Sequence, residues 1–166
     1  YKYFDEFQKA GCKYVAMEAS SEAFYRGRMQ GLEFDVSVIT NITREHLNIH
    51  GSFENYIECK SMLFKQTKKS GVCILNHDDS CYEQIKNICN GKILTYGKTE
   101  DNTLQIVNYK VNPKCTYITY KYEDKIYNIK SPLLGEFNVY NLAGAILACL
   151  SVNISWDKIL ENLDKV

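Results

Sequence analysis

Short apolar runs alternate with segments of helical periodicity along the first part of this chain. The apolar runs occupy residues 14–17, 36–39, 72–75 and 93–96. Helical spacing of apolar residues falls between them, at about residues 53–68 and 81–90. Strands that are buried on both faces have continuous apolar sequences, and parallel strands need a crossover segment that is usually a helix. The sequence therefore predicts an α/β domain with a mainly parallel sheet flanked by helices.

The pattern changes beyond Gly97. Residues 115–122 and 125–129 alternate between apolar and polar side chains, and Glu123 and Asp124 separate them. This period of two predicts a β-hairpin, with residues 104–107 as a neighbouring strand, so a small antiparallel region covers about residues 104–130. Helices are predicted at about residues 138–150 and around Trp156, and the first residues resemble the end of a helix.

Charge and composition limit the kinds of partner. The 166 residues contain 20 Lys and Arg and 20 Asp and Glu without any basic run, which argues against a surface for nucleic acid or membrane. No apolar stretch reaches membrane-spanning length, and the first residues lack signal-peptide character. The seven cysteines form no C-x-x-C pair and are odd in number, as in proteins with reduced thiols. We expect a cytoplasmic protein with small-molecule partners.

Polar side chains follow three of the predicted strands. Residues 18–21 follow the first apolar run, residues 40–46 follow the second, and residues 76–79 follow the third. Ligands of open α/β sheets bind beyond the carboxyl ends of the strands. The sequence therefore predicts a functional site at this edge of the sheet.

Lys60 lies inside the apolar stripe of the predicted helix that begins after Gly51, with Ser52 as its N-cap. It is four residues after Tyr56 and four before Phe64. Burying an ammonium group without a partner is costly and lowers its pKa. Lys60 thus extends its charge to solvent, pairs with a carboxylate, or reacts as a neutral amine.

Glu18 and His46 are predicted at the same edge of the sheet as Lys60. Taken singly, Glu18 would ordinarily be a capping or ion-paired carboxylate, and His46 a hydrogen-bonded histidine. Together, a carboxylate, an imidazole and an inward lysine suit a hard divalent cation and phosphate oxygens. The residues alone therefore predict a metal and phosphate site.

Several longer segments resemble one family of enzymes. They are Met-Glu-Ala-Ser-Ser at 17–21, Gly27-Arg28, residues 31–35, the run Thr-Asn-Ile-Thr-Arg-Glu-His-Leu-Asn-Ile-His-Gly at 40–51, Asn-His-Asp-Asp at 76–79, and Leu-Gly-Glu-Phe-Asn-Val-Tyr-Asn at 134–141. In this order and spacing the chain resembles the Mur ligases, and within them most strongly the UDP-N-acetylmuramoyl-tripeptide synthetases.

The resemblance implies a P-loop-NTPase-like central ATPase domain. Mur ligases also have an N-terminal uridine-binding domain and a C-terminal domain for the incoming amino acid. Residues 1–166 would form part of the central domain, with the phosphate-binding loop and both flanking domains outside them and no complete activity in isolation. The implied reaction uses ATP and Mg²⁺ to activate the carboxylate of UDP-MurNAc-L-Ala-D-Glu as an acyl phosphate. A diamino acid, meso-diaminopimelate or L-lysine, then attacks it to make a peptidoglycan precursor.

The resemblance also implies roles for individual residues. Glu18 and His46 would bind magnesium, and Lys60 would carry a carbamate that faces the metal, with His46 and Lys60 as the catalytic residues. The remaining implied contacts are to the muramoyl-peptide substrate, through Ser20, Arg26 and Arg28, and to the nucleotide, through Asn76, Asn138 and Asn141. Glu22 and Arg26 depart from the family pattern, and they either pair with each other or indicate a changed substrate.

Two alternatives remain open. The chain could belong to another related amide ligase, such as a folylpolyglutamate or cyanophycin synthetase, or to a non-catalytic Mur-like binding subunit. The His50-Gly51 ending and the segment 137–141 favour the muramoyl branch. The joint presence of Glu18, His46 and Lys60 argues against a non-catalytic protein.

Overall fold

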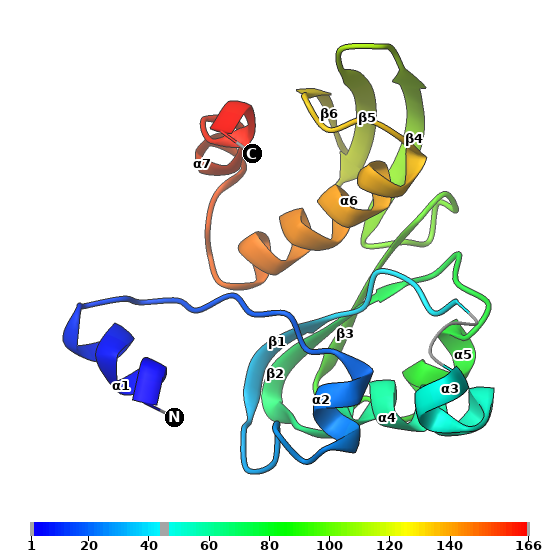
Figure 1. Ribbon diagram of the computed structural model, residues 1–166. Helices are drawn as coiled ribbons and strands as arrows, with labels where there is room; N and C mark the ends of the chain where they lie inside the picture. Colours follow the sequence, from blue (N-terminus) through cyan, green and yellow to red (C-terminus); the bar gives the residue numbers. More distant parts are fainter. Residues whose placement is uncertain (1, 44–46, 166) are drawn as a thin grey trace.

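The computed structural model describes residues 2–43 and 47–165, and these residues form one mixed sheet with helices around it (Figure 1). The sheet contains six strands in the order in which they occur along the chain. Their bounds are β1 Phe34–Val38, β2 Thr67–Asn76, β3 Lys92–Gly97, β4 Leu104–Val111, β5 Thr116–Tyr122 and β6 Lys125–Ser131.

Helices precede the sheet, separate its first three strands and follow its last strand along the chain. They are α1 Lys2–Lys9, α2 Ser21–Tyr25, α3 Leu47–His50, α4 Phe53–Lys65, α5 Tyr82–Lys86, α6 Glu136–Ser151 and α7 Trp156–Leu160, followed by a 3₁₀ turn at Leu163–Lys165. No helix within the described part of the chain has the length and apolar character to cross a membrane.

The parallel half of the sheet confirms the predicted α/β architecture. β1 pairs with β2, β2 with β3, and β3 with β4, all in parallel. Successive residues of β2 point to opposite faces, so Ile74 packs in the cluster beneath α6 whereas Cys73 and Leu75 pack with α4 and α5. Helices cover both faces, which is why this strand has a continuous apolar sequence.

The antiparallel half confirms the predicted hairpin and extends the same sheet instead of forming a separate one. β5 pairs with β4 and with β6 in antiparallel register. Glu123 and Asp124 both have positive φ, +48° and +61°, the geometry of the two-residue turns that fit the twist of a hairpin. Helices α6 and α7 pack against one face of these strands.

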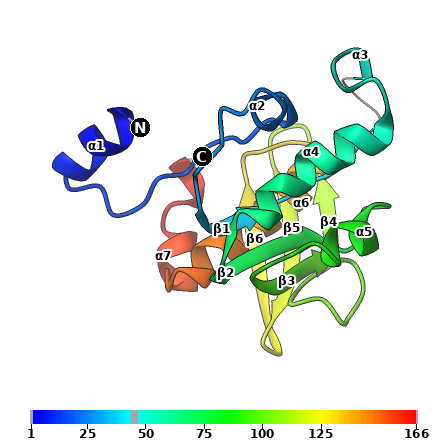
Figure 2. The same cartoon turned by 90° about the horizontal axis from the view of Figure 1, so that it is seen from below.

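The predicted strand at residues 14–17 is wrong. This segment is extended but belongs to no strand, and Tyr14, Val15 and Met17 are exposed. Among the described residues β1 is hydrogen-bonded to β2 alone, and the segment passes beyond that edge on its way from α1 to α2 (Figures 1 and 2). Apolar composition favours extended backbone, but a strand also needs a paired neighbour.

Two predicted helices are shorter than expected. α4 ends at Lys65 because β2 begins at Thr67, and α5 begins at Tyr82 and ends at Lys86, with Cys81 as its N-cap residue. The cysteines form no disulfide. Cys73 and Cys81 are buried and Cys12 is exposed, with the other four intermediate.

Candidate active site

The loops that follow β1 and β2 are held together by side chains at the carboxyl edge of the sheet. Asn76, at the end of β2, donates its Nδ2 to the Thr40 carbonyl oxygen at 2.9 Å, and its Oδ1 accepts from the Asp78 backbone N–H at 3.0 Å. Asp79 accepts from the Ile42 N–H at 2.7 Å. Two of the three polar segments predicted at this edge are therefore in direct contact.

A buried tyrosine fixes the same edge from the next strand. The hydroxyl of Tyr96, on β3, donates to the Ile39 carbonyl oxygen at 2.8 Å, and its side chain is fully buried. Burial raises the pKa of Tyr96, so its hydroxyl stays protonated and remains a donor. The backbone after β1 is thus anchored by donors from both β2 and β3.

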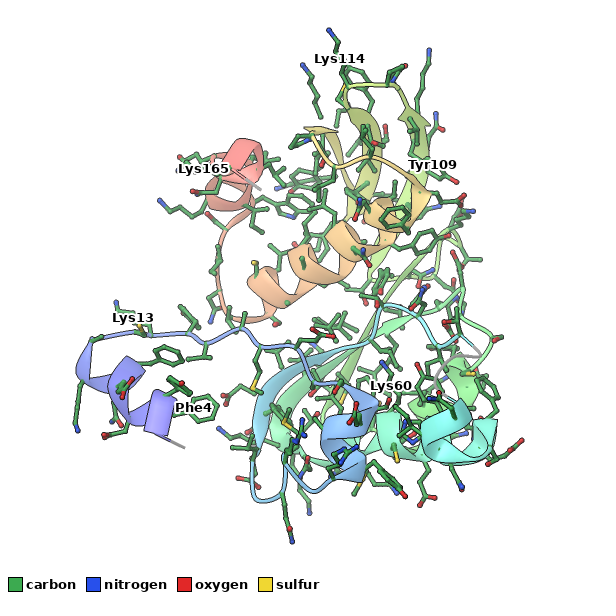
Figure 3. The ribbon with its side chains drawn as sticks, in the orientation of Figure 1. Phe4, Lys13, Lys60, Tyr109, Lys114 and Lys165 are labelled. Carbon is green, nitrogen blue, oxygen red and sulfur yellow. The ribbon has the colours of Figure 1, made fainter. Side chains whose placement is uncertain are left out.

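Lys60 lies in the third turn of α4, as the helical spacing predicted. Ser52 caps this helix by accepting from the Asn55 N–H at 3.2 Å. The Lys60 side chain is half-buried, and its Nζ lies 5.7 Å from the centre of the Tyr56 ring. Figure 3 places Lys60 in the part of the molecule formed by α2, α3 and α4.

The predicted substrate-binding residues flank helix α2. The Ser20 hydroxyl accepts from the Ala23 N–H at 3.2 Å and so caps the helix. Arg26 donates to Glu22 at 2.7 Å, which confirms the pairing of these two residues left open by the sequence. Arg28 is exposed in the turn after the helix.

His50 joins α2 to the start of α4 in the interior. Its Nε2 is 3.0 Å from the Ser21 hydroxyl, and both residues are 4% exposed. The imidazole ring also lies 5.6 Å from the Tyr25 ring and 5.4 Å from the Tyr56 ring, measured between centroids. The ring of Tyr56 therefore has His50 as one neighbour and Lys60 as another.

The predicted nucleotide amides lie on the first turns of α6. Asn138 donates to the Leu134 carbonyl oxygen at 2.8 Å, and Asn141 donates to Asn138 at 3.3 Å. The two amides share one face of the helix, as their spacing predicted, and Asn141 is exposed. Asn76 is buried at the neighbouring loop.

A polar network ties the beginning of α6 to the loops after β2 and β3. Tyr140 donates its hydroxyl to Asp78 at 2.8 Å, and Asp78 also accepts from the Lys98 N–H at 3.0 Å. Burial and the bond to Asp78 raise the pKa of Tyr140 to about 12. Lys98 lies 3.2 Å from Glu136, and hydrogen bonds from Tyr109 and then Lys98 lower the pKa of Glu136. Tyr109 stands beside this end of α6 in Figure 3.

The predicted metal ligands are only partly described. Glu18 is exposed in the extended stretch before α2, and Lys60 is half-buried on α4. His46 lies outside the described residues. Within residues 2–43 and 47–165, no three histidine, cysteine, aspartate or glutamate side chains gather as a metal centre would require.

Sequence reasoning missed the side-chain pairs that brace this region. Ser21 and His50 are 29 residues apart in sequence, and Asp78 and Tyr140 are 62 apart. Neither pair has a local periodic signal, because the partners meet only through the packing of separate elements.

Known proteins resemble this chain over most of its length. The family model described as the Mur ligase middle domain matches residues 1–149. The UDP-N-acetylmuramoyl-L-alanyl-D-glutamate–2,6-diaminopimelate ligase 1 of Clostridium acetobutylicum is 37% identical over 166 residues, covering 99% of this chain and 34% of that protein. The corresponding L-lysine ligase of Staphylococcus aureus strain MW2 is 32% identical over 172 residues, covering 99% of this chain and 35% of that protein.

Solved structures show the same fold. A UDP-N-acetylmuramoyl-L-alanyl-D-glutamate–2,6-diaminopimelate ligase superposes with a TM-score of 0.87 at 27% identity, over 97% of this chain and 34% of that one. The MurF ligase of Thermotoga maritima in complex with ADP superposes with a TM-score of 0.71 at 17% identity, over 89% of this chain and 34% of that one. The chain spans about a third of the length of the curated relatives it matches. The match to the middle-domain model over residues 1–149, together with the shared fold of the sheet, shows that this chain belongs to the Mur ligase family.

Proposed function

We propose that the protein containing this chain is an ATP-dependent ligase that joins a diamino acid to UDP-MurNAc-L-Ala-D-Glu in peptidoglycan precursor synthesis, in the cytoplasm. The observation that carries the proposal is the similarity over 99% of the chain to proteins named for that reaction. The two relatives differ in the diamino acid they are named for, so the proposal covers both meso-diaminopimelate and L-lysine.

The side chains on either side of α2 support binding of the muramoyl-peptide substrate. The Ser20 oxygen accepts from the Ala23 N–H, which leaves its own O–H free to donate to a substrate oxygen. Arg28 presents an exposed guanidinium that matches a carboxylate or phosphate through two parallel hydrogen bonds. Arg26 is occupied by Glu22, so a substrate contact by Arg26 requires this exposed pair to open.

The amides at the start of α6 support binding of the nucleotide. The Asn138 side chain is used on both sides, since it donates to Leu134 and accepts from Asn141. Asn141 keeps its carbonyl oxygen and one N–H for a ligand, the pair of groups that recognises the edge of a purine base. Asn76 supports the same site by holding the loop that carries Asp78.

The donor chemistry of Glu18 and Lys60 fits a magnesium ion if Lys60 is carbamylated. A neutral lysine amine and carbon dioxide give a carbamate and one proton, which replaces a half-buried cation with an oxygen anion. Glu18 and the Lys60 carbamate, with His46, would then hold the ion, and a carboxylate and a carbamate are hard oxygen ligands. Bound magnesium supplies neutralisation of the charge that develops during phosphoryl transfer.

The test uses the full-length protein with ATP, magnesium and UDP-MurNAc-L-Ala-D-Glu. We expect phosphate release and a UDP-MurNAc-tripeptide, seen by mass spectrometry, with one of the two diamino acids and not without magnesium. A parallel reaction with a folate and glutamate tests the folylpolyglutamate alternative. Ligation to folate, or phosphate release without any muramoyl product, would overturn the proposal.

A further inference from the structure

A buried hydrogen bond lies in the interior of the protein, between residues that are not among those proposed to bind substrate, nucleotide or metal. His50 and Ser21 are each 4% exposed and are hydrogen-bonded at 3.0 Å. The contact joins the first residue of α2 to the last residue of α3. Buried polar pairs between elements fix geometry, because either partner left alone would lose a hydrogen bond without regaining water.

His50 is itself rigidly attached to α4. Its carbonyl oxygen accepts from the Asn55 side chain at 3.0 Å. Gly51 follows with a φ of +75°, a left-handed conformation that turns the chain into the Ser52 cap. The imidazole therefore has a fixed position relative to the helix that carries Lys60.

The other end of α2 is docked by different contacts. Phe24 and Met29 form an apolar cluster against which Leu63 of α4 packs, and Gln66 donates to the Met29 carbonyl oxygen at 3.0 Å. These contacts hold the carboxyl end of α2 and the turn after it. The hydrogen bond between His50 and Ser21 holds the amino end, directly beside Ser20.

The histidine carries a local cost. Within the described residues, the buried Nδ1 of His50 has no hydrogen-bond partner. An unsatisfied buried polar atom destabilises the folded state, because it has lost its hydrogen bonds to water. An apolar side chain of similar size would remove that atom but would leave the buried Ser21 hydroxyl without this bond, so the contact with Ser21 is what the histidine provides. Residues that break a local rule at a cost are expected at functional positions.

We propose that His50 is a positioning residue, which through Ser21 sets the amino end of α2, and with it Ser20, at a fixed distance from Lys60 on α4. The inference rests on the proposed function, since Ser20 and Lys60 are the substrate and reaction sides of that site. A displacement of about 1 Å in a group that positions the substrate can lower the reaction rate on the order of a hundredfold.

The test compares two amide replacements in the full-length protein. In His50→Gln the amide reaches the position of Nε2 and can still bond Ser21, whereas in His50→Asn the amide reaches only the position of Nδ1. We expect His50→Asn and Ser21→Ala to lower kcat/KM for the muramoyl-dipeptide by about tenfold or more. His50→Gln should restore most of it, with unchanged KM for ATP in all three variants. The double variant Ser21→Ala/His50→Asn should lose no more than either single change, because both remove the same bond.

A second measurement is independent of the reaction. Amide hydrogen exchange should accelerate at residues 21–25 in His50→Asn, while residues 56–64 of α4 keep their protection. If the parent protein makes no tripeptide but α2 loosens in this way, the proposed function fails and the positioning contact stands. Equal activity of His50→Asn and parent, or equal losses for His50→Asn and His50→Gln, would overturn the positioning role.

Discussion

At the scale of single residues, Lys60 shows how a charge can lie inside an apolar stripe. Its Nζ stands 5.7 Å from the Tyr56 ring, an aromatic face that stabilises a cation by about 0.5–1 kcal/mol. This contact favours the ammonium form, and conversion of Lys60 to a carbamate would exchange it for contact with a metal ion. The ammonium form of Lys60 is therefore matched to the Tyr56 ring, and the carbamate form would be matched to a metal ion.

Replacing Lys60 tests the carbamate in the full-length protein. Lys60→Ala should lower kcat by about a hundredfold or more, because it removes a group that stabilises charge in the reaction. Short carboxylic acids such as acetate should restore part of the activity by supplying the missing carboxylate. The control is Lys65→Ala, an exposed lysine on the same helix, which should keep parent activity. Loss without any rescue by carboxylic acids would leave Lys60 with a structural role.

Glu22 and Arg26 illustrate what sequence spacing can and cannot determine. Four residues on one helix face predict an ion pair, and the structure has it at 2.7 Å. The pair is exposed, where such contacts stabilise by only about 0.3–0.5 kcal/mol. Local spacing predicted this contact correctly, whereas the buried contact of His50 with Ser21 joins distant residues and had no signal in the sequence.

At the scale of secondary-structure elements, α6 connects the two halves of the sheet. Its buried side chains Val139, Ala143 and Leu147 pack against strands of both halves. Its first turns carry Asn138 and Asn141, and Tyr140 joins it to the loop after β2. The position of the proposed nucleotide amides therefore depends on the same helix that holds the molecule together.

Removing the Tyr140 hydroxyl tests this dependence. Tyr140→Phe deletes a hydrogen bond to a carboxylate, a contact worth about 1.5–3 kcal/mol, at the lower end here because Tyr140 is only half-buried. We expect the KM for ATP to rise several-fold in the full-length protein and Tm to fall by a few degrees. Tyr117→Phe, on the exposed face of β5, should leave both unchanged. An unaltered KM for ATP in Tyr140→Phe would show that the hydrogen bond between Tyr140 and Asp78 does not contribute to nucleotide binding.

Gly144 lies where α6 packs closely against the sheet. A Cβ at this position would lie 3.0 Å from Val38 Cγ1 and 3.4 Å from Tyr96 Cε1. Gly144→Ala gains about 1 kcal/mol in helix propensity but overpacks the contact at a cost of about 1–3 kcal/mol. Urea denaturation should therefore show a net loss of about 1 kcal/mol. The neighbouring exposed Ala145 offers the control Ala145→Ser, which should change stability by less. A more stable Gly144→Ala would mean that the helix moves away from the sheet without penalty.

The elements themselves were largely predictable. Continuous apolar runs predicted β1, β2 and β3, and alternation predicted β5 and β6, because burial on two faces or on one face leaves different periodic patterns. The error at residues 14–17 has the same origin, since composition reports a tendency to be extended but not the presence of a pairing neighbour. The placement of Lys60 followed from helical spacing, whereas the roles of Glu18, His46 and the amides came from family resemblance.

At the scale of the whole molecule, the parallel and antiparallel halves share one sheet and one covering helix. The single tryptophan, Trp156 of α7, stacks on Tyr127 of β6 with ring centroids 3.8 Å apart. It belongs to the cluster that also contains Ile74 of β2 and Tyr96 of β3. The two halves should therefore unfold together.

Two optical probes test this cooperativity in the 166-residue chain. Trp156 fluorescence reports on the antiparallel half, and far-UV circular dichroism reports on all helices and strands. Their urea denaturation curves should coincide, as they do in two-state unfolding. Comparison with Trp156→Phe separates the fluorescence of the tryptophan from that of the tyrosines. A fluorescence transition at lower urea than the dichroism transition would show that the hairpin region unfolds by itself.

The order of the six strands in the sheet is also their order along the chain. During synthesis a ribosome releases the amino end first, at about 5–20 residues per second. Each of these six strands then emerges beside an edge that is already in place, so none of them must be inserted between two earlier ones. Helix α6, which packs against strands of both halves, docks only after the hairpin has formed. The helices that follow the hairpin thus cover a sheet that can grow one strand at a time.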